Sequence, residues 1–255
     1  MDRGTWLGIL LGLTLLGVAI GLGPNPRIFI HPASMIVVFG GIIASTLIRF
    51  PLASVLSALK IASHAFLPLS RTPNQAVMEL VGLSQRARRE NLKGLEQNLP
   101  SDVFLANGLQ MVIDRVDRDH IRDVLTQELH ATQDRHALGQ EIFRFIAASA
   151  PSFGMVGTLI GMVQLFGSMK DPSGIAGAMA LSLLSTLYGA VVSYLFALPI
   201  SGKLELRSKE ELQIKHLQVD GILGIASEMN PSSLEEMLNA HLAPRMKVRR
   251  QAVRG

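Results

Sequence analysis

Four long runs without a charged residue constrain the fold of this chain more than any other feature. They cover residues 4–26, 28–48, 145–169 and 172–202 of the 255-residue sequence. Each run supplies the roughly 20 residues that a helix needs to cross a hydrocarbon core about 30 Å thick. The first run is longer than the apolar part of a secretory signal and leads into the second, so we expect it to be retained. The runs therefore predict an all-α, polytopic membrane protein with four transmembrane helices.

The charged residues lie between these runs and predict the orientation of the chain. Residues 49–144 hold 12 Lys and Arg against 11 Asp and Glu, and the segment after Ile200 holds 9 against 7. The other two connectors carry only three charged residues, Arg27, Lys170 and Asp171. Because Lys and Arg accumulate on the cytoplasmic side of membrane proteins, we expect both termini and the middle region in the cytoplasm and the spans in the inner membrane.

The runs and charges together divide the chain into four predicted segments. These are transmembrane helices 1 and 2 in residues 1–48, a cytoplasmic helical region in 49–144, transmembrane helices 3 and 4 in 145–202, and a cytoplasmic C-terminal helix with a basic tail in 203–255. Within the cytoplasmic region we expect amphipathic helices that open at Pro73, at an Asp102 cap, and at Asp117 or Asp119. The last of them should continue into the third span.

Composition and motifs exclude most catalytic chemistries. The chain has no cysteine, which rules out disulfides, thiolate zinc sites and thiol catalysis. It also lacks the H-E-x-x-H, G-x-S-x-G and phosphate-loop patterns and a dinucleotide fingerprint. The net charge of +4 follows from the basic cytoplasmic segments, so it does not indicate nucleic acid. We expect neither an enzyme nor a nucleic-acid-binding protein, and no cofactor.

The third and fourth runs each carry a stripe of small and polar residues at helical spacing. The stripes consist of Gly154, Thr158 and Gly161 in the third run, and of Ser182, Thr186, Gly189 and Ser193 in the fourth. One interpretation is close helix packing, because small residues let backbones approach and hydroxyls bond across helices. The other is an ion path along the stripes, because Thr158 and Thr186 lie near the middle of their runs and can offer oxygen ligands to a desolvated cation.

The four runs contain no acidic residue. Intramembrane carboxylates are the groups that usually carry protons or sodium ions through ion-driven machines. A stripe of neutral hydroxyls alone cannot bind and release a coupling ion strongly enough to do work. If ions pass here, we expect another polypeptide to bring the carboxylate.

Two prolines lie near the predicted cytoplasmic ends of the last two spans. Pro151 and Pro199 each remove a backbone donor, which loosens or kinks a helix. The pair is interpreted either as two helix boundaries or as a hinge. We place both prolines in the predicted ion pathway, together with Gly154 and Gly161.

Residues 150–161, which read APSFGMVGTLIG, carry a motif that resembles a known family. With Asp171-Pro172 and residues 184–190, this motif is similar to the MotA/PomA flagellar stator subunits of the MotA/TolQ/ExbB superfamily. The likeness extends over nearly the whole chain. ExbB and TolQ proteins have one span before their cytoplasmic region, so the additional N-terminal run favours the flagellar branch. An ExbB/TolQ-like energiser of outer-membrane processes is the alternative.

The resemblance implies an assembly and a function. Five copies of this chain would form a ring around the spans of two copies of a MotB/PomB-type partner, whose aspartate carries the ion and whose periplasmic domain binds peptidoglycan. Ion flow through the bacterial inner membrane would turn the ring, and its cytoplasmic helices would drive the switch-ring protein of the rotor. This expectation agrees with the absence of a carboxylate from the spans.

The resemblance also assigns roles to individual residues. It implies that Arg88, Arg89 and Glu96 face the rotor and that the two prolines are functional. Thr158 and Thr186 match positions that sodium-driven members use around the ion. We therefore expect a sodium path at these two threonines and Na⁺ as the coupling ion, with H⁺ as the alternative.

Overall fold

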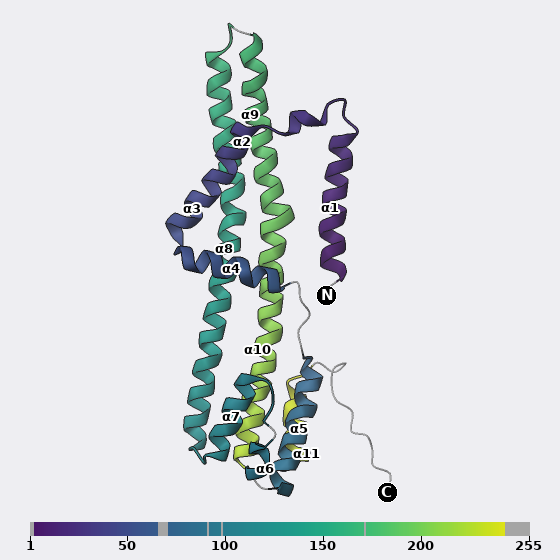
Figure 1. Ribbon diagram of the computed structural model, residues 1–255, viewed down its shortest axis with the longest axis vertical. Helices are drawn as coiled ribbons and strands as arrows, with labels where there is room; N and C mark the ends of the chain where they lie inside the picture. Colours follow the sequence, from purple (N-terminus) through teal and green to yellow (C-terminus); the bar gives the residue numbers. More distant parts are fainter. Residues whose placement is uncertain (1–2, 66–70, 91, 98, 171, 243–255) are drawn as a thin grey trace. The chain divides into compact units, whose positions relative to one another are not determined.

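The computed structural model describes residues 3–65, 71–90, 92–97, 99–170 and 172–242, and the regular elements among them are helices (Figure 1). The predicted all-α class is confirmed for this part of the chain. Asp171 and the basic tail from residue 243 lie outside it. The chain forms two compact units: the first combines residues 1–68 with 136–206, and the second combines 69–135 with 207–255.

The first unit contains the N-terminal helices and parts of two long ones. Its elements are α1 (Arg3–Gly21), the 3-10 turn η1 (Pro26–Phe29), α2 (Pro32–Met35), the π-helical turn η2 (Ile36–Gly40), α3 (Gly41–Arg49), α4 (Leu52–Ala65), α9 (Pro172–Val191) and the π-helical turn η3 (Val192–Ala197). The long helices α8 (Arg118–Gly167) and α10 (Leu198–Ala226) each contribute to both units. The helix α4 was not predicted individually from the sequence.

Three stretches of the described residues are long and apolar enough to cross a membrane. They are Pro26–Arg49, Arg118–Gly167 and Gly174–Ala226. The helix α1 adds 19 residues before the first of them. Large apolar side chains stand on the outside of this unit, with Ile36 73%, Val163 71% and Leu183 68% exposed. Such a surface fits lipid or partner helices and not water.

Tyr188 of α9 forms hydrogen bonds with Phe29 and His31, near the start of the second apolar run. Its hydroxyl donates to the Phe29 carbonyl oxygen at 2.5 Å and accepts from the His31 amide at 3.1 Å. His31 caps α2, because its Nδ1 accepts from the Ser34 amide at 3.3 Å. The buried Ser34 hydroxyl donates to the Leu181 carbonyl oxygen at 3.3 Å. In an apolar medium polar atoms need internal partners, so these bonds set how α2 meets α9.

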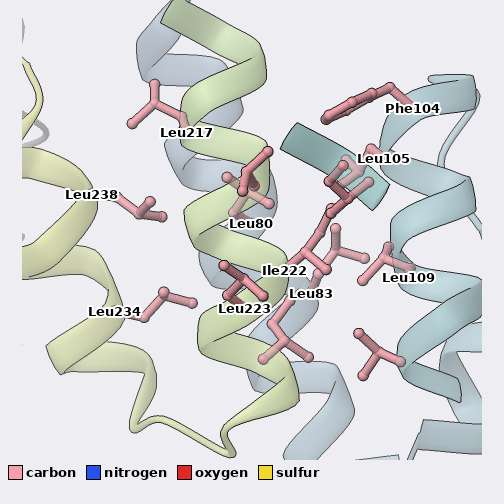
Figure 2. Packing of buried hydrophobic residues seen from close by; sticks show 14 of the residues in the cluster. Leu80, Leu83, Phe104, Leu105, Leu109, Leu217, Ile222, Leu223, Leu234 and Leu238 are labelled. Carbon is pink, nitrogen blue, oxygen red and sulfur yellow. The ribbon is translucent and has the colours of Figure 1, made fainter. Parts of the chain in front are cut away.

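The second unit has a core of the kind found in water-soluble helical domains. Its elements are α5 (Pro73–Glu90), α6 (Leu92–Glu96), α7 (Val103–Ile113), α11 (Pro231–Ala240) and the outer parts of α8 and α10. Leucine and isoleucine side chains from α5, α7, α10 and α11 converge between the helices (Figure 2). Leu80, Leu105, Leu217 and Leu234 are fully buried. Burying one such side chain stabilises a fold by about 1.5–3 kcal/mol, so this core holds the unit together.

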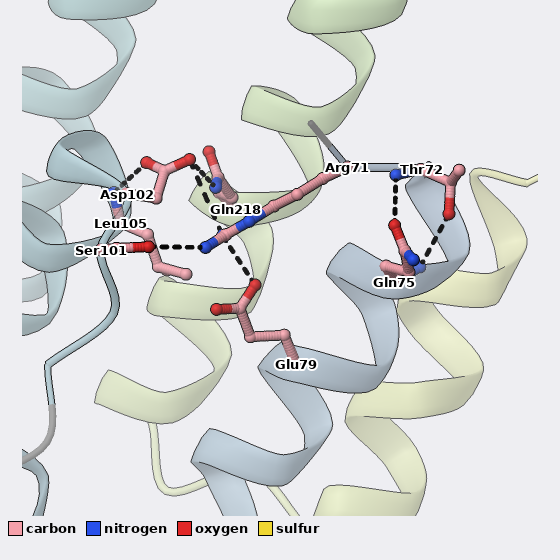
Figure 3. A network of polar contacts seen from close by, with 8 residues as sticks. All are labelled: Arg71, Thr72, Gln75, Glu79, Ser101, Asp102, Leu105 and Gln218. Atoms are coloured by element: carbon pink, nitrogen blue, oxygen red, sulfur yellow. Dashed lines mark hydrogen bonds and ion pairs between the residues drawn. The ribbon is translucent and has the colours of Figure 1, made fainter. Parts of the chain in front are cut away.

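Asp102 joins a helix cap to a buried amide in the second unit (Figure 3). One carboxylate oxygen accepts from the Leu105 amide at 3.1 Å and caps α7. The other accepts from Nε2 of Gln218 at 3.2 Å, which satisfies a side chain that is 1% exposed. Arg71 lies beside this carboxylate at 3.8 Å and pairs with Glu79 at 2.7 Å. The predicted Asp102 cap is therefore confirmed.

The other predicted helix starts are also confirmed. The helix α5 begins at Pro73. Just before it, the Gln75 side-chain oxygen accepts from the Thr72 backbone amide, and the Thr72 hydroxyl accepts from the Gln75 backbone amide. Asp117 caps α8, since its Oδ2 accepts from the amides of Asp119 at 3.1 Å and of His120 at 3.4 Å. From there α8 continues without interruption to Gly167, so the helix that was predicted to begin at Asp117 or Asp119 and most of the third apolar run form one element.

Candidate functional site

Glycines let α8 and α9 approach until their backbones touch. A β-carbon added at Gly154 would lie 3.0 Å from the Ser185 carbonyl oxygen, and one at Gly189 would lie 2.5 Å from that of Ala150. Added β-carbons at Gly157 and Gly161 would overlap serine side chains of α9. Side chains at these positions would therefore force the helices apart. The structure thus places Gly154 and Gly161 as packing residues that bring the two polar stripes together.

The close approach brings Thr158 and Thr186 into contact. Their Oγ1 atoms lie 2.6 Å apart. The Thr158 hydroxyl also lies 3.1 Å from the Gly154 carbonyl oxygen and 3.2 Å from that of Ser182. Thr158 is half-buried, whereas Thr186 is exposed at the edge of the helix pair. The structure therefore brings the two predicted threonines together, and their role in an ion path stays a prediction.

Ser182 closes the hydroxyl cluster from the α9 side. Its hydroxyl donates to the Thr158 carbonyl oxygen at 3.1 Å and to that of Ala178 at 3.2 Å. The cluster therefore consists of neutral hydroxyl and carbonyl oxygens, which are the ligands that hard cations such as sodium accept. Among the described residues, no group of His, Cys, Asp and Glu could hold a metal ion. The cluster can thus coordinate or relay a cation, but it supplies no negative charge of its own.

The Ser193 hydroxyl replaces a backbone hydrogen bond that Pro151 removes inside α8. Proline has no amide hydrogen, so the carbonyl of Ala147, four residues earlier, loses its helical partner. The Ser193 hydroxyl donates to this carbonyl oxygen at 2.8 Å from the π-helical turn η3, and both residues are buried. Ser193 was predicted as part of the stripe, but its bond to Ala147 was not predicted. The available signal was Pro151 itself, because a proline inside a helix leaves the carbonyl four residues earlier in need of a donor. A buried serine on the neighbouring helix, such as Ser193, can supply that donor.

Pro199 lies on the surface as the second residue of α10, directly after η3. At this junction the Leu198 amide bonds the Ser193 carbonyl, five residues back, instead of the one four back. The extra residue in this turn shifts the hydrogen-bond register of the helix by one residue just before Pro199. Pro151 and Pro199 are therefore both associated with η3, which fits the hinge interpretation as well as a helix boundary.

The three predicted rotor-facing residues are exposed in the second unit. Arg88 and Arg89 lie in the last turn of α5, and Glu96 lies at the end of α6. Arg88 donates from Nη2 to the Glu228 carbonyl oxygen at 2.8 Å. Within the described part of the chain, Arg89 and Glu96 form no ion pair with each other or with a neighbour. These two charges are therefore available to a partner.

Comparisons with known proteins agree with this architecture. Residues 96–216 match the model of the MotA/TolQ/ExbB proton channel family. The chain is 34% identical to the chemotaxis protein PomA of Vibrio alginolyticus, over 95% of this chain and 96% of that protein. It is 30% identical to motility protein A of Bacillus subtilis, over 95% of this chain and 91% of that protein.

Solved structures share the same fold. The flagellar MotAB stator complex from Bacillus subtilis matches with a TM-score of 0.84 and 27% identity, covering 96% of this chain and 97% of that chain. The C. jejuni MotAB structure matches with a TM-score of 0.86 and 23% identity over the same shares. Both matches extend over both compact units.

Fold and site together define a helical membrane protein whose last two apolar helices hold a neutral oxygen cluster. The chain belongs to the MotA/TolQ/ExbB proton channel family. Its full-length relatives include PomA and motility protein A proteins, which confirms the resemblance drawn from the motif at residues 150–161.

We predict that the Ser193→Ala change destabilises the protein by about 1–3 kcal/mol, because it leaves the buried Ala147 carbonyl without a partner. In a Pro151→Ala background the helix regains its own amide donor. The cost of Ser193→Ala should then fall by about 1 kcal/mol. Thermal unfolding of the four variants in detergent measures this coupling.

Ser185→Ala is the matched control for this cycle. The Ser185 hydroxyl is equally buried but bonds the Leu181 carbonyl of its own helix at 2.7 Å. Its loss should cost the same with either residue at position 151. An equal cost of Ser193→Ala in both backgrounds would contradict the repair that we assign to Ser193.

Proposed function

We propose that this chain is the ring-forming, ion-conducting stator subunit of a bacterial flagellar motor. The observation that carries this proposal is the Thr158–Thr186 hydroxyl pair, whose Oγ1 atoms lie 2.6 Å apart between the apolar runs 145–169 and 172–202, which contain no acidic residue. Full-length similarity to PomA and motility protein A supports it. The helix α1 before η1 favours the flagellar branch over an ExbB/TolQ-like energiser, since the latter has one span fewer.

The proposed topology has four transmembrane helices in the inner membrane, with both termini on its cytoplasmic side. The three long apolar stretches supply three spans, and α1 supplies the fourth. The excess of Lys and Arg in residues 49–144 and after Ile200 supports the orientation. The second unit, with its water-soluble type of core, is then cytoplasmic.

The proposed assembly has five copies of this chain around two copies of a one-span, peptidoglycan-binding partner of the MotB/PomB type. A neutral oxygen cluster holds a cation weakly, so a carboxylate from the partner must complete the site. The exposed Thr186 hydroxyl at the edge of the helix pair is available to such a group. The relatives of known structure are MotAB complexes, which supports the pairing.

Deletion and complementation in the source bacterium test this function. We expect cells without the chain to assemble flagella that do not turn. Swimming should return only when the chain is expressed with its one-span partner, because the chain alone lacks the carboxylate. Ion-coupled rotation by the chain without a partner would contradict the proposal, and unchanged swimming with a leaky outer membrane would favour the energiser.

The proposed rotor surface includes Arg88, Arg89 and Glu96. We predict that charge reversal at any of them lowers torque without changing membrane insertion or ring assembly. Each exposed pair contributes about 0–1 kcal/mol and is screened by salt, so single reversals should weaken and not abolish torque. Rotation of tethered cells measures it, with Arg135→Glu, an exposed charge of α8 in the same unit, as the control. Normal torque in all three variants would make these residues an ordinary solvated surface.

The proposed coupling ion is sodium. A proton can bind a partner carboxylate without further ligands, whereas sodium must replace its water with several oxygens. The Thr158 and Thr186 hydroxyls and the Gly154 and Ser182 carbonyls supply four oxygens close together. Thr158→Ala should therefore abolish swimming or reduce its dependence on sodium, and Thr158→Ser should preserve both.

Swimming speed against external sodium at fixed pH and membrane voltage is the measurement. Full speed without sodium, together with arrest by a protonophore, would assign the proton as the coupling ion. That result would leave the stator function intact.

A further inference from the structure

A cavity of about 530 Å³ lies within the first unit, between α1 and the elements that face it. One wall comes from the second half of α1 and consists of Leu13, Leu16, Gly17 and Ile20. The opposite wall comes from η1, η2, α9 and η3, and it includes Phe29, Phe39, Tyr188, Val192 and Phe196. The cavity therefore separates the N-terminal helix from the pair of apolar helices that carries the candidate site.

The contacts of α1 explain why space remains here. A β-carbon added at Gly12 would lie 2.5 Å from Cδ1 of Leu195 in η3, so α1 touches the rest of the unit at that point. At Gly17, further along the same helix, an added β-carbon would meet no atom within 4 Å. An empty space of this kind deprives the side chains around it of van der Waals partners. A ligand that fills it therefore stabilises the position of α1.

The lining shows what cannot fill the cavity. Apart from one tyrosine, its residues are leucine, isoleucine, valine, phenylalanine and glycine. The Tyr188 hydroxyl already donates to the Phe29 carbonyl oxygen and accepts from the His31 amide. A buried water needs two to four polar partners, and a polar ligand needs them as well. The occupant is therefore apolar where it contacts this wall.

The volume separates the two apolar occupants that a membrane offers, which are a lipid chain and a helix of another polypeptide. A helix with its side chains is about 10 Å across, so 530 Å³ holds about 7 Å of its length, little more than one turn. A spanning helix needs about 30 Å. A single acyl chain is thinner and flexible, and it is abundant in the hydrocarbon core. The cavity therefore fits an acyl chain and not a helix.

Arg27 supplies a charge beside the cavity. It lies in η1 two residues before Phe29, and it is the charged residue of the connector 23–31. Its side chain is exposed and forms no ion pair within the described residues. A guanidinium binds phosphate oxygens through two parallel N–H donors. An exposed arginine at the end of a span thus fits the phosphate of a lipid whose chain enters the cavity.

We infer that this cavity binds an anionic phospholipid, with one acyl chain between α1 and α9 and the phosphate on Arg27. The inference rests on the proposed topology, in which α1 is a span, and adds a lipid ligand to it. The bound chain supplies the contact that α1 does not make with α9 along this stretch. It thereby joins α1 to the elements that surround η3.

Native mass spectrometry of the complex of this chain with its partner tests the inference. The purified complex is incubated in detergent with equal amounts of dioleoyl-phosphatidylglycerol and dioleoyl-phosphatidylcholine, and the retained lipids are identified by mass. We expect each copy of the chain to retain phosphatidylglycerol severalfold more than phosphatidylcholine. Phosphatidylglycerol should also raise the thermal unfolding midpoint, because a ligand that binds only the folded state stabilises it.

Gly17→Phe fills the cavity, and Gly8→Phe is its matched control. Both glycines are exposed in α1 and an added β-carbon at either meets no atom within 4 Å, but only Gly17 lines the cavity. Gly17→Phe should lose the retained lipid and the rise in midpoint, whereas Gly8→Phe should keep both. Gly17→Leu fills less space and should lose the lipid in part, which covers the case that the larger side chain prevents assembly.

Arg27→Gln tests the headgroup, and Lys170→Gln is its control. Lys170 is the exposed basic residue of the other short connector and does not line the cavity. Arg27→Gln should still retain a lipid, because the acyl chain keeps its site, but the preference for phosphatidylglycerol should fall severalfold. Lys170→Gln should leave that preference unchanged.

Four results would overturn the inference. They are no retained lipid in the unmodified complex, equal retention by the Gly17 variants, an unchanged preference in Arg27→Gln, and retention of a free fatty acid in place of a phospholipid. If the unmodified complex holds no lipid and Gly17→Phe breaks the ring, the cavity belongs to a neighbouring copy. Lipid retention is measured on the purified complex and rotation in cells, so failure of the stator function and failure of the lipid site are separate results.

Discussion

The close approach of α8 and α9 is the constraint on which the rest of the candidate site depends. A bilayer gives no hydrophobic driving force for helix association, so packing and interhelical hydrogen bonds must supply it. Four glycines remove the side chains that would separate the two backbones. Only at this separation do Thr158 and Thr186 meet at 2.6 Å. The same contact satisfies polar atoms that would otherwise lie unpaired in an apolar medium.

The chemistry of the site follows from what this contact lacks. Its oxygens are neutral, and the apolar runs around it hold no acid. A site of this kind can position a cation or a carboxylate but cannot drive transport by itself. In the proposed assembly, ligands and charge are divided between two polypeptides, so that ion passage would require assembly and a single chain would not leak ions.

The two compact units differ in which side chains they bury and which they expose. The second unit buries its leucines, with Leu80, Leu105 and Leu217 inaccessible. The first unit presents large apolar side chains such as Ile36 and Val163 outward and buries hydroxyls such as those of Ser34 and Ser185. Water and lipid account for the difference, because each unit hides the groups that its surroundings solvate poorly. The charged residues of the proposed rotor surface, Arg88, Arg89 and Glu96, belong to the second unit.

The sequence by itself determined the features that depend on neighbours along the chain. The apolar runs predicted the spans, Asp102 and Asp117 predicted helix starts, and the spacing of the stripes put Thr158 on one helix face and Thr186 on another. Caps and periodicity are local, so one sequence is sufficient to read them.

Only the tertiary structure decided which distant groups meet. The rotation of each helix and the depth of its contact set the Thr158–Thr186 pair, the Ser193 bond to Ala147, and the position of Arg88 beside Glu228. These pairs join residues far apart in the chain, and no local spacing encodes their distance. The left-handed conformations that Arg115 and Glu228 adopt after α7 and α10 were hidden for a related reason. A helix end is usually recognised by its glycine, and here charged side chains stand in that place.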